Sequence, residues 1–254
     1  MGRTATGESV LSRAVRILET FTPEEPILQV SQIAARSGLH RATASRLIAE
    51  LVEHGLLTRE ADRRLRIGVR VWELGLRASV AQSLREVSLP YMRSAHSVIG
   101  HQVQLGIRDR DDVIWLERLS ALGAVTDATR VGGRAPLPVS SAGLVLLAFG
   151  PRELQERVLA ERSSPFGPKT VAESNQLRRS VAEVRKRGFA WRRGDTREET
   201  CSVAVPVRNA EGTVVAALAA LFPSDEERKL VAARVLLTAA RGITSAPRRR
   251  PVDY

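Results

Sequence analysis

The hydrophobic positions in the first 55 residues recur with the spacing of helices. Apolar residues from Val10 to Phe21 lie three and four positions apart, which predicts an amphipathic helix. A second short helix is predicted around Val30–Ala34, and Ser37–Leu39 is a tight turn with a glycine at the helix end. A third helix follows from about His40 to His54, and Gly55 closes it.

The third helix has two different sides. At about 100° per residue, its apolar stripe runs from Ala44 to Leu51. A helix whose free side is small, hydroxylated and basic in its first half can enter the major groove of DNA, because small residues allow close approach and Arg, Ser and Thr bind base edges or phosphates. Two short helices, a glycine turn and such a helix predict a helix-turn-helix. The free side consists of Arg41, Ala42, Thr43, Ser45, Arg46 and Ala49.

A basic hairpin follows the third helix. Leu56–Arg59 and Leu65–Gly68 are predicted as two strands, and the turn between them carries Arg63 and Arg64 at its tip. Such a hairpin is the wing of a winged helix, and its arginines can reach phosphates. Eight arginines and four acids lie from Arg36 to Arg70, so this motif carries 8 − 4 = +4.

Strands and helices alternate in the rest of the chain. Residues 79–90 continue the helical pattern, and we expect that helix to end before Pro90. Four segments then form two predicted hairpins, and the Val/Ala patterning is typical of central antiparallel strands with helices over one face. The hairpins join Gln102–Ile107 to Val113–Leu119, and Cys201–Val207 to Thr213–Leu221.

Composition narrows the class of protein. The 254 residues contain 39 basic and 28 acidic side chains, a net charge of +11, which favours a polyanionic partner. The apolar runs are shorter than the roughly 20 residues needed to span a bilayer, so we expect a cytoplasmic protein without a membrane partner.

Cys201 is the only cysteine, so neither an internal disulfide nor a thiolate zinc site is expected. His96 and His101 are five residues apart, which does not suit two ligands on one helix face, so we expect no metal and no other cofactor.

Several segments in order resemble the IclR family of bacterial transcription regulators. The similarity covers about residues 9–246, and Leu144 departs from it at a position where the family commonly has Lys. The segments that carry the resemblance are Ser12–Leu18, Ile33–Leu47, Leu51–Leu57, Leu65–Gly68, Trp72–Gly75, Arg130–Pro138, Ser141–Ala148, Val184–Ala190, Ser202–Val207 and Gly212–Leu218.

The resemblance implies an α+β protein with an N-terminal winged helix-turn-helix, a linker helix and a C-terminal GAF/PAS-like α/β effector-binding domain with an antiparallel sheet. It also implies a homodimer or homotetramer on palindromic double-stranded operator DNA, controlled by a small-molecule effector. The expected boundaries are a disordered lead 1–8, the winged helix 9–69, the linker 70–88, the effector domain 89–246 and a disordered basic tail 247–254.

Two sets of site residues follow, and no catalytic residue is among them. For DNA we expect Arg13 and Ser31 on phosphates, Arg41, Thr43 and Ser45 on bases, with Ala42, Arg46 and Arg64 also at the interface. The effector site implied by the resemblance consists of Thr126, Ser140, Ser141, Arg192, Ser202, Ala219 and Leu221.

The implied effector site is less polar than in some family members. Sugar-acid and small-oxoacid binders often have Ser at the positions of Ala219 and Leu221, and an acid-rich run near Arg192. An apolar site with an arginine at its mouth suits an amphipathic carboxylate, with an aromatic acid as one form of it. The alternative is that Ala219 and Leu221 belong to the sheet core and the arginine is solvated. Two other functions stay open at this point: a non-specific DNA-binding protein, and a sensor or enzyme with a structural N-terminus.

Overall fold

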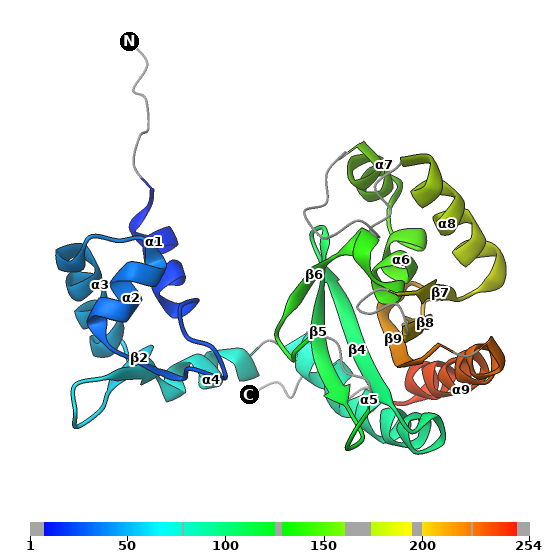
Figure 1. Ribbon diagram of the computed structural model, residues 1–254, viewed down its shortest axis with the longest axis horizontal. Coiled ribbons are helices and arrows are strands. Elements are labelled where there is room, and N and C mark those ends of the chain that lie inside the picture. Colours follow the sequence, from blue (N-terminus) through cyan, green and yellow to red (C-terminus); the bar gives the residue numbers. More distant parts are fainter. Residues whose placement is uncertain are drawn as a thin grey trace, which may run out of the picture. The chain divides into compact units, whose positions relative to one another are not determined.

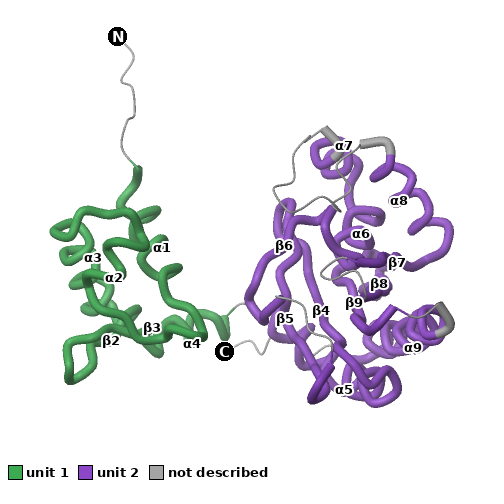
Figure 2. Tube along the Cα trace, viewed as in Figure 1, with its two compact units in different colours: residues 1–79 green, residues 80–254 purple. Residues whose placement is uncertain are grey.

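The computed structural model describes residues 8–77, 79–124, 129–160, 174–194, 200–224 and 226–247. The chain divides into two compact units, residues 1–79 and residues 80–254 (Figure 2). Most of the expected disordered lead and tail lies outside the described residues.

The first unit contains three helices, a small sheet and a fourth helix (Figure 1). The sheet is antiparallel with strand order β1-β3-β2, and its β2–β3 hairpin is the predicted wing. The elements are α1 (Val10–Leu18), β1 (Ile27–Leu28), α2 (Val30–Ser37), α3 (Arg41–Glu53), β2 (Leu57–Arg59), β3 (Leu65–Ile67) and α4 (Val69–Leu76).

The apolar stripe of α3 builds the core of this unit, as the sequence predicts. Leu47 and Ile48 are fully buried and pack against Ile17 of α1 and Ile33 of α2. Gly38 connects α2 to α3 at φ 64°, a left-handed conformation that glycine adopts without a Cβ penalty. The turn therefore fixes the helix-turn-helix while the core orients α3.

The second unit is built on a six-stranded antiparallel sheet with strand order β6-β5-β4-β9-β8-β7. Both predicted hairpins are present, as β4–β5 and β8–β9. The strands are β4 (Gln102–Asp109), β5 (Asp112–Leu119), β6 (Arg134–Pro136), β7 (Ala190–Arg193), β8 (Thr200–Arg208) and β9 (Val214–Pro223). The helices are α5 (Ser79–Ile99), α6 (Ser141–Ala148), α7 (Arg152–Ala160), α8 (Ser174–Arg187) and α9 (Glu226–Ser245), with a 3-10 turn at Leu137–Val139.

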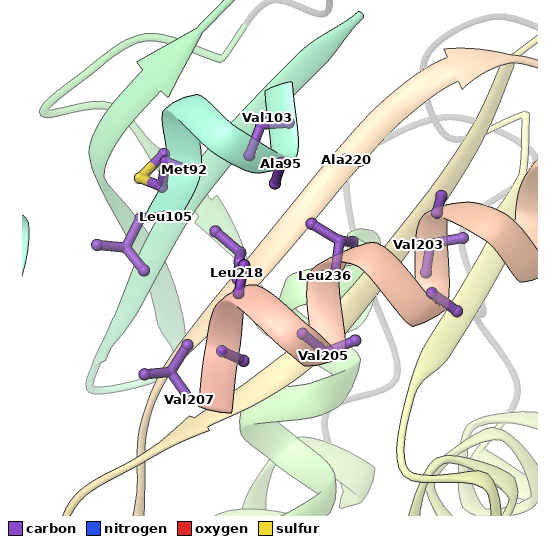
Figure 3. Close-up of a cluster of buried hydrophobic side chains, with 14 of the residues drawn as sticks. Met92, Ala95, Val103, Leu105, Val203, Val205, Val207, Leu218, Ala220 and Leu236 are labelled. Atoms are coloured by element: carbon purple, nitrogen blue, oxygen red, sulfur yellow. The ribbon is translucent and has the colours of Figure 1, made fainter. Parts of the chain in front are cut away.

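The two faces of this sheet are covered by different helices (Figure 1). One face presents large aliphatic side chains, such as Leu105 and Leu218, to α5 and α9 (Figure 3). The other face presents small residues, Ala204 and Ala217 among them, so α6 packs closely on it. Gly143 is required there, because a Cβ at this position would lie 2.0 Å from the Leu137 carbonyl oxygen.

Two sequence predictions about the connecting helix are wrong. The helix does not end before Pro90: α5 continues through it to Ile99. Proline removes one backbone hydrogen bond, but the burial of Leu84 and Met92 against the sheet outweighs that loss. The expected single linker helix is also two helices, because α4 ends at Leu76 and α5 begins at Ser79. Residues 80–88 are therefore the first turns of a helix that belongs to the second unit.

Candidate DNA-binding surface and effector site

The free side of α3 is exposed in the first unit. Arg41, Ser45 and Arg46 are exposed and Thr43 is half-buried, while the intervening Ala44 is fully buried. The Nδ1 atom of His40 accepts a hydrogen bond from the backbone N–H of Ala42, so this histidine caps the helix. The sequence thus places a cationic and hydroxylated surface at the first turns of a rigid helix.

Two arginines of the predicted DNA-binding surface, Arg46 and Arg64, form ion pairs within the first unit. Arg46 Nη1 lies 2.6 Å from Glu50 Oε1, one turn along α3. In the wing, Arg64 Nε lies 2.6 Å from Asp62 Oδ2. Hydrogen bonds from the backbone and side chain of Arg64 hold the pKa of Asp62 below its usual value, so this carboxylate stays charged at neutral pH. Both pairs are exposed, so phosphates can compete for these arginines.

The remaining predicted DNA-contact residues, Arg13 and Ser31, lie on α1 and α2, the two helices that precede α3. Arg13 is half-buried on α1, and its Nε donates to the carbonyl of Ser9 at 3.4 Å. Ser31 is exposed in the first turn of α2. The wing tip residue Arg63 has φ 66°, which is unusual for a residue with a side chain.

In the second unit, strand register places three of the predicted effector residues in one row. Arg192 pairs with Ser202, and Ser202 pairs with Leu221. Leu221 also pairs with Gln102 on β4, so the row crosses β7, β8, β9 and β4. Directly paired residues share a face of the sheet, and this row lies on the face that α6 covers. The row is therefore polar at both ends with a leucine between them.

The start of α6 approaches the Arg192 end of this row. Arg192 Nη1 donates to the carbonyl of Pro138 at 2.7 Å, two residues before the helix cap. Ser140 is the N-cap, and its Oγ accepts from the backbone N–H of Gly143 at 3.0 Å. A helix N-terminus and a guanidinium group both favour a negative charge.

A polar network on β4 and β5 escaped the sequence analysis. Gln102 and Gln104 are buried on the same face, and the Nε2 of Gln102 donates to the Oε1 of Gln104 at 3.1 Å. Thr129 donates to the same oxygen at 2.9 Å, and Arg118 in turn donates to the Thr129 carbonyl. Two glutamines spaced by two in an otherwise apolar strand are the signal that could have found it.

The structure brings most of the implied effector residues together. Arg192, Ser202 and Leu221 belong to the row, and Ser140 caps the helix that begins beside its Arg192 end. Thr126 lies outside the described residues. Ser141 is buried at the start of α6, and Ala219 is buried on β9 on the face of the sheet that α6 covers.

Other candidate chemistry lacks support in the described part of the chain. Cys201 is buried, and its sulfur accepts a hydrogen bond from the indole N–H of Trp191. Desolvation and the nearby Arg228 lower the pKa of His101, which keeps it neutral. Among the residues the structure describes, no group of His, Cys, Asp or Glu could hold a metal ion. None of the described helices is both long and apolar enough to cross a bilayer.

A winged helix with an exposed basic recognition helix, joined in one chain to an α/β unit with a buried polar row, defines a class of protein: DNA-binding regulators that respond to small molecules. The family models agree. "IclR helix-turn-helix domain" matches residues 10–61, and "Bacterial transcriptional regulator IclR C-terminal" matches residues 77–243. The chain belongs to the IclR family of transcriptional regulators and combines a DNA-binding domain with an effector-binding domain.

Several known proteins are similar over most of the chain. An IclR homologue from Microbacterium hydrocarbonoxydans, solved in complex with 4-hydroxybenzoate, is 38% identical with a TM-score of 0.85, and the match covers 93% of this chain and 98% of that chain. The transcriptional regulator XynR of Escherichia coli (strain K12) is 27% identical over 82% of this chain and 83% of its own length. The regulator KdgR of Dickeya chrysanthemi is 24% identical over 87% of this chain and 74% of its own length.

Proposed function

We propose that this regulator responds to an aromatic carboxylic acid bound over the row that Arg192, Ser202, Leu221 and Gln102 form. The row is the observation that carries the proposal. Its leucine provides an apolar surface for a ring, and its Arg192 end, beside the start of α6, favours a carboxylate. The 4-hydroxybenzoate complex of the homologue that is 38% identical supports the same ligand class.

A panel of acids tests the ligand class. Differential scanning fluorimetry of the full chain is run with benzoate, 4-hydroxybenzoate, pyruvate, glyoxylate and a sugar acid. We expect the aromatic acids to raise the melting temperature, because a ligand that binds only the folded state stabilises it. If only the small hydroxy or oxo acids raise it, the proposal of an aromatic acid fails.

On DNA, Arg41, Thr43 and Ser45 read base edges, while Arg13, Ser31, Arg46 and Arg64 bind phosphates. The proposal rests on exposure and position: Arg41 is the first residue of α3, whereas Arg46 lies a turn further and is paired with Glu50. The N-terminal residues of a recognition helix are those that contact bases. Ala42 is exposed in the same turn and allows the backbone to approach.

Two alanine variants separate base contacts from phosphate contacts. We expect Arg41→Ala to relax preference at one base pair of a half-site by about 1–3 kcal/mol. Arg46→Ala should weaken binding on all sequences and reduce the salt dependence. Fluorescence anisotropy with operator and scrambled duplexes measures both, and equal losses on the two duplexes for Arg41→Ala contradict a base-reading role.

The active form is a homodimer that forms through the outer faces of α1 and α4. Leu11 on α1 is 73% exposed and Trp72 on α4 is 64% exposed, each amid further exposed apolar side chains. Such surfaces mark association sites, and a two-fold dimer matches a palindromic operator.

Sedimentation velocity tests this interface. Leu11→Asp should shift the protein to monomer and weaken operator binding, because a charge cannot be buried there without a partner. Leu122→Asp, at a fully exposed leucine of the second unit, is the matched control and should stay dimeric. A dimer that persists with Leu11→Asp and with Trp72→Asp places the interface elsewhere.

A further inference from the structure

The side chain of Gln104 is held in place at one end only. It is 5% exposed, and its Oε1 accepts hydrogen bonds from Gln102 and Thr129 at 3.1 and 2.9 Å. These bonds fix the orientation of the amide, because the donors face its oxygen. Its Nε2 forms no hydrogen bond with any described residue. This nitrogen is not among the buried unpartnered side-chain atoms of the described residues, so its two N–H groups face space that water or a ligand can reach.

The position of Gln104 relates this amide to the proposed ligand row. Gln104 pairs with Ala219 on β9, two residues before Leu221, and lies two residues along β4 from Gln102, on the same face of the sheet. Ser202 on β8 is two strand spacings from β4, or about 10 Å across the sheet. Gln104 lies diagonally across β9 from Ser202, because the residue opposite Ser202 in the row is Gln102. A ring that lies along this diagonal, over Leu221 and Ala219, and directs its carboxylate toward Ser202 and Arg192 directs its opposite end toward Gln104.

The neighbours of Gln104 suit a neutral polar group rather than a second charge. Arg118, which pairs with Gln104 from β5, is engaged with the carbonyl of Thr129. Ala219, which pairs with Gln104 from β9, has only a methyl side chain. An uncharged donor selects an oxygen acceptor such as a phenolic hydroxyl.

We propose that Gln104 is a specificity-determining residue: its Nε2 donates a hydrogen bond to the para oxygen of a 4-hydroxylated aromatic acid. This inference rests on the proposed function, since the ring must lie over the row for its para position to reach β4. On this proposal Gln104, a residue of β4, lets the protein distinguish para-hydroxylated acids from acids with an apolar para group.

Isothermal titration of the full chain compares 4-hydroxybenzoate with 4-methylbenzoate, which has similar shape but no oxygen acceptor. The wild type should bind the hydroxyl ligand about three- to tenfold more tightly, the value of one hydrogen bond to an uncharged donor. Gln104→Met, similar in volume but without N–H groups, should remove this preference and leave the affinity for 4-methylbenzoate unchanged. Gln176→Met, on the exposed face of α8, is the control and should keep the preference.

Each other outcome overturns the inference in a recognisable way. If the wild type binds neither acid, the proposed function fails and the role of Gln104 fails with it. If the wild type binds both acids equally, or Gln104→Met keeps the preference, the aromatic site stands and Gln104 does not read the para position. If Gln104→Met weakens both ligands equally, Gln104 supports the site through Gln102 and Thr129 and does not read the para position, which also overturns the inference. Should the methionine variant melt far below the wild type, Gln104→Asn, which withdraws the amide by one methylene, must show the same loss of preference.

Discussion

Ser88 lies in the middle of α5 with its hydroxyl buried and without a hydrogen-bond partner among the described residues. It is four residues from Leu84 and from Met92, on the stripe that packs against the sheet. A helical serine usually bonds a carbonyl one turn back or faces water, and Ser88 does neither. We therefore expect Ser88→Ala to stabilise the second unit.

The size of the effect follows from three contributions. An unsatisfied buried hydroxyl costs about 1–3 kcal/mol, and alanine is the better helix former by about 0.5 kcal/mol. The lost contacts of one oxygen atom offset part of this gain. A net gain of about 1–2 kcal/mol remains, and in a unit of 254 − 79 = 175 residues it raises the melting temperature by about 2–8 °C.

Differential scanning calorimetry of the full chain measures this change, with Ser94→Ala as the matched control. Ser94 lies on the same helix but is exposed, and its hydroxyl donates to the Pro90 carbonyl at 3.2 Å. The control should stay within about 0.5 kcal/mol of the wild type. A Ser88→Ala protein that is no more stable than Ser94→Ala would show that the Ser88 hydroxyl is satisfied, for instance by a buried water, and the reasoning would be refuted.

Three further variants test other contacts. Asp62→Asn removes the ion pair of Arg64 in the wing, so operator affinity should rise about two- to fivefold in a fluorescence anisotropy titration. The titration is run at 0.1 M salt, where charges within about 10 Å still interact. Asp111→Asn, the same charge change on the second unit, should not raise operator affinity. The Arg157 hydrogen bond lowers the pKa of Asp111, so the pair contributes stability above the unfolded pKa of about 3.9 and loses it as pH falls further. Asp111→Asn should accordingly cost less than about 1 kcal/mol at pH 7 and nothing near pH 2, as measured by thermal melts. Pro90→Ala restores a backbone donor in α5 and should raise the melting temperature of the second unit; a lower value would mean that the helix needs its proline bend.

The sequence predicts most of the first unit, because its elements are short and locally determined. The stripe from Ala44 to Leu51 has a clear helical period, and Gly38 marks the turn before it. The prediction that the helix ends before Pro90 is wrong for a physical reason. Proline disfavours a helix locally, but α5 gains more by burying its apolar side chains against the sheet. That sheet forms from residues far away in the sequence, so a local pattern does not reveal it. The ion pairs Arg46–Glu50 and Arg64–Asp62 join residues that are four and two positions apart, so sequence spacing alone could have predicted both pairs.

The two functional surfaces differ in how sequence can reveal them. On α3 the proposed DNA-binding side is the one that the apolar stripe leaves exposed, so identifying the core also identifies this surface. In the second unit the proposed ligand faces the sheet from within, and polar residues there look like isolated exceptions until register aligns them. Gln102, Leu221, Ser202 and Arg192 come from four strands and span 221 − 102 + 1 = 120 positions of sequence, and only the pairing of those strands makes them neighbours. Leu221 becomes informative once Gln104 is placed diagonally from it on β4, because the two residues together suit the proposed aromatic acid, with an apolar surface for its ring and a donor for its para oxygen.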